Sequence, residues 1–332
     1  MAASGFVYQA PWWLPGGNAQ TVWAALFARR HRGAAPQWQR QRWTTPDGDF
    51  VDVDTSTHPV APQAPLLVLF HGLEGSSASQ YAVAFADFAA RAGIVLAVPH
   101  FRGCSGELNL APRAYHSGDF QEVDWMLRRF AAEHPGRPRV AAGVSLGGNA
   151  LLRWAGEVGG QAGRTVRAVA SICSPLDLAA GGRAIGRGFN RLVYTRMFLS
   201  TMVPKALEKL EQHPGLFDRE ALLAARDLYA FDNLFTAPLH GFRDTDDYWT
   251  RASAKPVLAD IRVPALTLNA RNDPFVPASS LPAAAQAGPH VTLWQPAQGG
   301  HVGFPVSLPP LGLPGHVMAM PDAVGRWLLD TL

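Results

Sequence analysis

The sequence has little cysteine and little charge. Only two of its 332 residues are cysteines, Cys104 and Cys173, which excludes a disulfide framework and favours a reducing compartment. Charged residues make up 17% of the chain, and 29 basic residues against 26 acidic ones give a formal net charge of +3. Nucleic-acid binders need a concentrated basic surface, so we expect no nucleic-acid partner.

Long apolar runs are also missing. No stretch approaches the roughly 18 consecutive apolar residues of a transmembrane helix, so we expect no stable membrane insertion. Residues 1–9 lack the basic start, the apolar run and the small-residue cleavage site of a signal peptide. Together these absences predict a cytoplasmic protein.

Short apolar runs alternate with helical stretches along the chain. Residues 39–45 and 50–54 flank an Asp47-Gly48 turn, which predicts a β-hairpin. Apolar runs predict further strands at 66–70, 94–98, 139–142, 166–172, 265–269 and 290–294. Helical patterns lie at 79–92, 119–134, 148–158 and 318–332. This alternation is typical of an α/β fold, here a mostly parallel sheet with an N-terminal antiparallel hairpin and helices on both faces.

The interval between the predicted strands 166–172 and 265–269 far exceeds the dozen or so residues that a parallel crossover needs. Amphipathic stretches in this interval predict a helical insertion, either a cap over the site or a packed peripheral subdomain. The predicted organisation is a first part of the core with an N-terminal extension at 1–181, a helical cap insertion at 182–250, and a second part of the core at 251–332.

The N-terminal extension contains one predicted helix. We expect Asn18 to cap this helix, whose apolar face carries Val22, Trp23, Leu26 and Phe27. Packing of that face on the body of the protein is the expectation, and contact with a membrane or with substrate is the alternative.

A G-x-S-x-G motif at 143–147 indicates nucleophilic chemistry. The motif follows a predicted strand and opens a predicted helix, so Ser145 would lie on the sharp turn that lifts a hydroxyl clear of the sheet. Because a serine hydroxyl is a poor nucleophile, it needs a base that takes its proton. A glycine-rich turn that holds an inert serine or binds a phosphate is the alternative.

Candidates for the base and its acidic partner follow in the order serine, acid, histidine that this motif predicts. Asp273 comes after the strand 265–269, and His301 follows the last strand between glycines that let its loop place an imidazole. Asp177 is the rival acid. His116 competes by residue type but precedes the serine, so we expect it to make a structural hydrogen bond.

Ester cleavage also requires donors to an oxyanion and a pocket for the acyl chain. The backbone N–H groups of Leu146, directly after Ser145, and of Leu73, in the loop 71–75, are the predicted donors. We predict that Phe198, Leu199 and Phe235 of the insertion line the pocket. Histidines and carboxylates show no H-x-H or H-E-x-x-H spacing, so we predict no metal and no other cofactor.

Motifs along nearly the whole chain give it a family resemblance. They are Asn18-Ala19-Gln20-Thr21, Thr45-Pro46-Asp47-Gly48-Asp49-Phe50, His71-Gly72-Leu73-Glu74-Gly75-Ser76, Phe101-Arg102-Gly103-Cys104-Ser105-Gly106-Glu107, Tyr115-His116-Ser117-Gly118-Asp119, Gly143-Val144-Ser145-Leu146-Gly147-Gly148-Asn149, Phe242-Arg243-Asp244 and Asn272-Asp273-Pro274-Phe275. In these motifs the chain resembles the YheT-like α/β-hydrolases. The resemblance implies an α/β-hydrolase fold and carboxylic-ester hydrolysis through residues that fall on Ser145, Asp273 and His301. Members act on short-chain esters or on lipids, so the substrate stays open.

The sequence therefore predicts a serine hydrolase that cleaves short- to medium-chain carboxylic esters through an acyl-enzyme on Ser145. Its expected partner is a small-molecule ester or lipid-like substrate, and its oligomeric state stays open. Acyl transfer to an alcohol through the same residues is one alternative. A non-catalytic ligand-binding protein that keeps the fold is another, although binding alone would not require all three residues.

Overall fold

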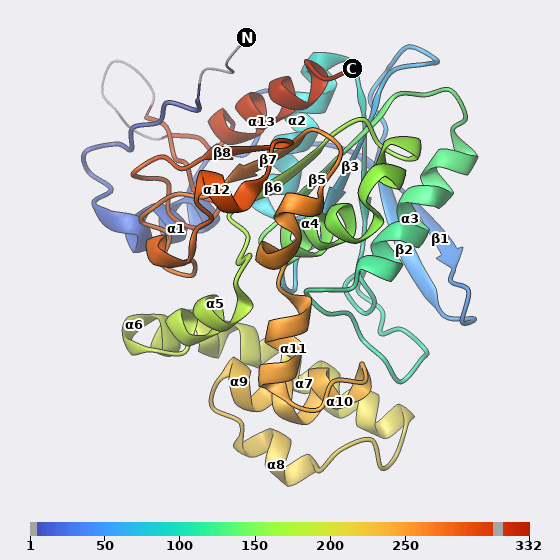
Figure 1. Cartoon of the computed structure of the whole chain (residues 1–332), viewed down its shortest axis with the longest axis vertical. Helices are drawn as coiled ribbons and strands as arrows, with labels where there is room; N and C mark the ends of the chain where they lie inside the picture. The colour runs from blue at the N-terminus through green and yellow to red at the C-terminus, as the bar shows by residue number, and fades with distance from the viewer. Residues whose placement is uncertain (1–4, 308–314) are drawn as a thin grey trace.

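The computed structural model describes residues 5–307 and 315–332, and their centre is one sheet of eight strands. The order across the sheet is β1-β2-β4-β3-β5-β6-β7-β8 (Figure 1). The strands are β1 (Trp38–Thr44), β2 (Phe50–Ser56), β3 (Leu66–Phe70), β4 (Val95–Pro99), β5 (Arg139–Val144), β6 (Val169–Ile172), β7 (Ala265–Leu268) and β8 (Val291–Trp294). Each coincides with a predicted strand apart from small shifts at the ends.

The strand pairing confirms the predicted mixed sheet. β1 and β2 form the antiparallel hairpin, β2 also pairs antiparallel with β4, and the remaining neighbours are parallel. All residues of β3 and β4 are buried, as expected for strands that helices cover on both faces. Alternate residues of β3 therefore enter two separate cores.

Helices cover the two faces of the sheet. α2 (Gln80–Ala92) and α13 (Ala319–Leu329) pack against one face. α3 (Phe120–Glu133) and α4 (Leu146–Val158) pack against the other. Shorter elements complete the core: η1 (Gly159–Arg164), η4 (Lys255–Asp260), η5 (Ala278–Ser280) and α12 (Ala284–Ala287).

The N-terminal helix α1 (Gly16–Leu26) begins before Asn18, so the predicted cap is wrong. The Asn18 side chain instead accepts a hydrogen bond at 2.9 Å from the hydroxyl of Tyr194, far along the chain. This distant partner competes with local capping, and a sequence pattern cannot reveal it. Leu26 and Phe27, at the end of the predicted apolar face, are exposed.

Helices fill the interval between β6 and β7. They are α5 (Leu178–Ile185), α6 (Gly188–Asn190), the π-helical turn η2 (Arg191–Thr195), α7 (Arg196–Gln212), α8 (Arg219–Ala224), α9 (Leu228–Phe231), the π-helical turn η3 (Asp232–Thr236), α10 (Ala237–Leu239) and α11 (Thr245–Ala252). We call this helical insertion the cap; it lies below the sheet in Figure 1. The three-part division of the chain at 181/182 and 250/251 stays a prediction. Within the described ranges, no helix is long and apolar enough to cross a bilayer.

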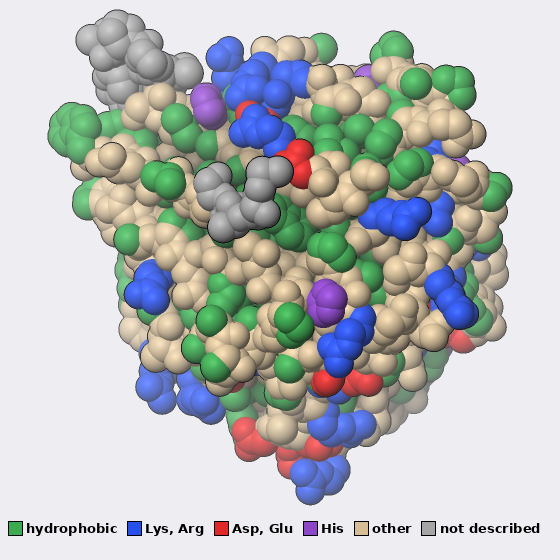
Figure 2. Space-filling model, turned by 45° about the horizontal axis from the view of Figure 1, so that its top comes forward, with side chains coloured by type: hydrophobic (Ala, Val, Ile, Leu, Met, Phe, Trp, Pro, Cys, Tyr) green, Lys and Arg blue, Asp and Glu red, His purple; other side chains and the backbone are tan. Residues whose placement is uncertain are grey.

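One face of the molecule shows how basic side chains are arranged there. On the face drawn in Figure 2, Lys and Arg side chains stand in several separate groups between apolar and uncharged side chains. The absence of a nucleic-acid partner stays a prediction.

A buried ion cluster fixes the loop that follows β4. The Arg102 guanidinium, only 4% exposed, lies 2.8 Å from carboxylate oxygens of Asp47 and Asp49 and 2.6 Å from Glu122. Asp47 and Asp49 belong to the hairpin turn, and Glu122 belongs to α3. The loop from Arg102 onward therefore has a defined course toward the site.

We predict that Arg102→Met destabilises the protein by about 3–5 kcal/mol, because it leaves buried carboxylates without a counter-charge. Urea unfolding followed by circular dichroism measures this loss. The matched control is Arg128→Met, which removes an exposed partner of Asp124 and should cost less than about 1 kcal/mol. Equal losses for the two variants would contradict a stabilising role for the cluster.

Candidate active site

Ser145 occupies a strained turn between β5 and α4. Its backbone has φ 52° and ψ −118°, a conformation that residues other than glycine rarely adopt. The turn is close-packed, since a Cβ placed on Gly147 would lie 2.4 Å from the carbonyl oxygen of His71. Glycine at 147 thus permits the close approach that raises Ser145 above the edge of the sheet.

The structure brings Ser145, His301 and Asp273 together at the carboxyl ends of the strands. The Ser145 hydroxyl lies 3.0 Å from Nε2 of His301, and Nδ1 of His301 lies 2.9 Å from Oδ2 of Asp273. The other oxygen of Asp273 accepts the backbone N–H groups of Phe275 and Val276. The Asp273 side chain is fully buried.

This arrangement sets the tautomer of His301. Because a carboxylate only accepts, Nδ1 carries the proton and donates it to Asp273, which leaves the lone pair of Nε2 facing the Ser145 hydroxyl. The ring of Phe275 packs against the imidazole with centroids 4.2 Å apart. An imidazole oriented in this way can accept the serine proton during attack on a carbonyl.

The rival residues have other roles. Asp177 caps α5, where its carboxylate accepts the N–H of Ala180 at 2.9 Å. His116 accepts the N–H of Gly118 at 3.2 Å, which is the structural hydrogen bond expected of it. Burial lowers the pKa of His116 to about 3, so it stays neutral near pH 7.

The loop 71–75 presents the second predicted oxyanion donor. Leu73 and Leu146 both border the pocket at Ser145, and Leu146 is the first residue of α4, where helix N–H groups lack internal partners. Two tyrosine hydroxyls hold the loop: Tyr81 accepts the N–H of Gly72, and Tyr115 accepts that of Glu74, each at 2.9 Å. Both tyrosines fix the loop that contains Leu73, although neither belongs to the G-x-S-x-G motif around Ser145.

The N-terminal helix supports the His301 loop, a role that the sequence did not reveal. The hydroxyl of Thr21 accepts the His301 backbone N–H at 2.8 Å. Gln20 is fully buried, and its Oε1 accepts from the Asn272 side chain and from the backbone of Gly299. The framework of the site therefore includes the motif Asn18-Ala19-Gln20-Thr21. The sequence indicates this role only through the presence of the motif among those that carry the family resemblance.

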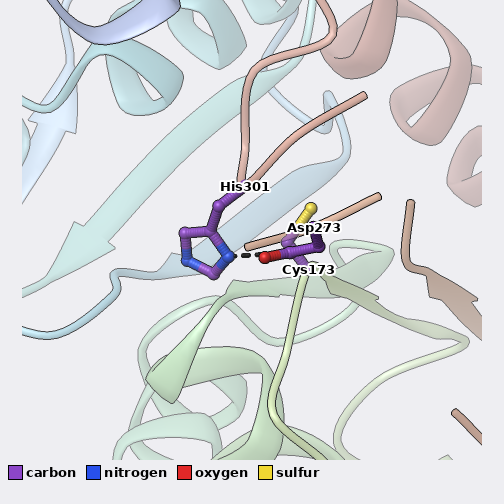
Figure 3. Close-up of side chains that lie close together, drawn as sticks. All are labelled: Cys173, Asp273 and His301. Carbon is purple, nitrogen blue, oxygen red and sulfur yellow. Dashed lines mark hydrogen bonds and ion pairs between the residues drawn. The ribbon is translucent and has the colours of Figure 1, made fainter. Parts of the chain in front are cut away.

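Cys173 lies behind the carboxylate. Figure 3 shows it with Asp273 and His301, and one potential ligand atom from each lies within 4.8 Å of the others, a spacing that could hold a metal ion. Burial raises the pKa of the Cys173 thiol well above its usual value, which favours the protonated thiol. The sulfur instead accepts the N–H of Val302 at 3.2 Å, which supports the His301 loop.

A largely apolar pocket opens between Ser145 and the cap. It encloses about 1170 Å³, part of it open to solvent. Phe198 and Phe235 line it as predicted, together with Met202 and Phe231. Leu199 does not border the pocket and packs inside the cap, so this third pocket prediction is wrong. Adjacent residues on a helix point about 100° apart, and here Phe198 turns toward the cavity while Leu199 packs between the cap helices.

Two carboxylic acids also border this pocket, Glu74 and Asp232. Asp232 accepts hydrogen bonds from the Thr236 hydroxyl at 2.7 Å and from the Trp249 indole at 2.8 Å. Burial raises its pKa to about 6, because the surrounding atoms solvate the charged form poorly. Neither hydrogen bond links Asp232 to Ser145, His301 or Asp273.

Comparison with known proteins gives the family. Residues 65–307 match the family described as alpha/beta hydrolase fold. A protein of Escherichia coli strain K12 named "Putative esterase YheT" is 39% identical over 86% of this chain and 84% of its own length. The chain belongs to the YheT-like α/β-hydrolases. Phospholipase ABHD3 of mouse is 31% identical over 81% of this α/β-hydrolase and 66% of its own length.

Solved structures share the fold of this α/β-hydrolase. The Pyrococcus furiosus esterase Pf2001 aligns with a TM-score of 0.56 at 13% identity, over 92% of this chain and 97% of that one. A bacterial membrane phospholipase A aligns with a TM-score of 0.54 at 18% identity, over 88% and 86%. At these identities the likeness concerns the fold alone.

We predict that Thr21→Val lowers the free energy of unfolding by about 1–3 kcal/mol, since the variant keeps the shape but leaves the His301 N–H without its acceptor. Urea unfolding measures the change. Thr21→Ser keeps the hydroxyl and should stay close to the wild type. If Thr21→Ser loses as much as Thr21→Val, the hydroxyl is not the stabilising group.

A second prediction concerns Asp232 and pH. The folded-state pKa lies above the unfolded value of about 3.9, so the folded protein binds the extra proton and loses stability as pH rises. Relative to Asp232→Asn, the wild type should lose on the order of 2–3 kcal/mol between about pH 4 and pH 7. Thermal unfolding of both proteins across this range measures the difference, and parallel curves would contradict it.

Proposed function

We propose that the protein hydrolyses carboxylic esters through an acyl-enzyme on Ser145, with His301 as general base and Asp273 as the acid that orients it. The observation that carries this proposal is the chain of two hydrogen bonds from Asp273 through His301 to Ser145, at the mouth of an apolar pocket. Relatives named esterase, phospholipase and monoacylglycerol lipase support ester hydrolysis as the class of reaction.

In the first half of the proposed reaction, Oγ of Ser145 attacks the ester carbonyl carbon while its proton moves to Nε2 of His301. The carbonyl oxygen becomes an oxyanion, toward which the N–H groups of Leu73 and Leu146 would donate. The bond between carbonyl carbon and alcohol oxygen then breaks, and that oxygen takes the proton from His301. Water next attacks the acyl-enzyme with His301 as base, which releases the acid and restores Ser145.

We further propose that the acyl chain is of short to medium length and lies against the aromatic wall of the cap. Phe198 and Phe235 support this placement, since both border the pocket that contains Ser145. Apolar walls with few polar groups suit a chain of methylene groups, whose burial contributes about 0.8 kcal/mol for each CH₂.

We predict that Asp273→Asn lowers kcat for p-nitrophenyl butyrate about 10⁴-fold, because an amide no longer holds the imidazole in the required tautomer. Ser145→Ala should abolish turnover while leaving the circular dichroism spectrum and unfolding midpoint close to those of the wild type. Initial rates of p-nitrophenol release measure both effects.

The matched control is Asp177→Asn, which alters another carboxylate near the site. It should keep turnover within a few-fold, because Asp177 only caps α5. An inactive Asp177→Asn beside an active Asp273→Asn would overturn the assignment of the acid. Full activity of Ser145→Ala would overturn the proposed reaction.

A further inference from the structure

One segment of the cap carries positive charge without acidic side chains. Between Asp177 and Glu208 the chain contains five basic residues and no Asp or Glu. Lys205 is paired, at 2.8 Å, with Glu74 of the loop 71–75. The other four are exposed, and none has an ion-pair partner within residues 5–307 and 315–332: Arg183, Arg187, Arg191 and Arg196. Exposed arginines elsewhere, such as Arg128 and Arg219, do pair with acids.

Large apolar side chains are exposed on this same segment. Phe189 is 55% exposed, Leu192 59% and Met197 52%, and Val193 is also exposed. Phe189, Val193 and Met197 follow one another at intervals of four residues, which places them along one side of the continuous helical segment 188–212. We call these four side chains and the four arginines the cap patch. Such a combination of apolar and cationic side chains is unusual on a surface that only meets water.

The opposite side of this segment reaches the site. Phe198 and Met202 border the pocket, and the ring of Phe198 lies 6.3 Å from that of Phe275, which packs on His301. Tyr194 is buried and bonds to Asn18 of α1. The helical segment that walls the pocket therefore carries the four apolar side chains of the cap patch, with Arg191 and Arg196, on its exposed side. Arg183 and Arg187 lie just before this segment.

We propose that the cap patch docks the protein on an anionic lipid surface. Apolar side chains on one side of a helix, flanked by arginines, suit the boundary between acyl chains and negatively charged headgroups. A second copy of the chain suits this patch less, because a symmetric dimer would bring two sets of unpaired arginines together. Docking here places the outer side of the pocket wall in the lipid interface. The proposal concerns binding and does not depend on the proposed ester hydrolysis.

The test is co-sedimentation of the full-length protein with vesicles of phosphatidylcholine, with and without added phosphatidylglycerol. The wild type should bind the anionic vesicles, and binding should fall when salt rises from about 0.05 to 0.5 M, where surface charges are screened. Arg191→Gln/Arg196→Gln should weaken binding about 30-fold, since each arginine contributes roughly a five-fold factor. Leu192→Ser/Met197→Ser should weaken binding as well. These residues do not border the pocket, so turnover of p-nitrophenyl acetate should persist.

Arg164→Gln/Arg167→Gln is the matched control. It removes the same charge from two exposed arginines that precede β6, at the edge of the sheet opposite Ser145, and should bind vesicles like the wild type. Ser145→Ala should also bind like the wild type, which separates docking from catalysis.

Three results would overturn the proposal. The first is no preference of the wild type for anionic vesicles at low salt. The second is an equal loss of binding in Arg191→Gln/Arg196→Gln and Arg164→Gln/Arg167→Gln. The third is a concentration-dependent dimer in sedimentation equilibrium that Leu192→Ser/Met197→Ser abolishes, which would make the patch a self-association surface.

Discussion

The site depends on the hydrogen bond between Asp273 and His301. A neutral imidazole can face the Ser145 hydroxyl with its lone pair only if a partner holds the proton on its other nitrogen, and the buried carboxylate is that partner. Much of the surrounding structure restrains these two groups. The backbone of Phe275 and Val276 fixes the carboxylate, and Thr21 fixes the backbone of His301.

The cap adds a second layer to this framework. Its helix α7 borders the pocket through Phe198 and Met202, and Lys205 on the same helix pairs with Glu74 beside Leu73. Glu74 has a positive φ of 56° and is held by the Tyr115 hydroxyl. A displacement of α7 would therefore shift the pocket wall and the loop beside Ser145. A surface that binds the outer side of α7 could act on both.

The sequence predicts the sheet and the approach of Ser145, Asp273 and His301 well, because these features depend on local patterns. Apolar runs of four to six residues mark buried strands, and the glycines around Ser145 and His301 mark turns at their ends. The sequence predicts less well which residues of the cap face the pocket. Leu199 shows why: which side of a cap helix faces the pocket depends on packing between helices, and the π-helical turn before α7 changes the phase of the pattern.

The sequence does not predict the long-range hydrogen bonds that hold the site. Asn18 looks like a helix cap but bonds to Tyr194, and Gln20 and Thr21 bond to the loop of His301. A polar residue in a helix does not reveal a partner that lies between 176 and 280 positions away. The central claim, that the His301 imidazole activates Ser145, is tested most directly by labelling with a fluorophosphonate and mapping the modified peptide by mass spectrometry. The account predicts one rapid modification on Ser145 that His301→Ala suppresses; labelling of another serine, or equal labelling rates in the variant, would contradict it.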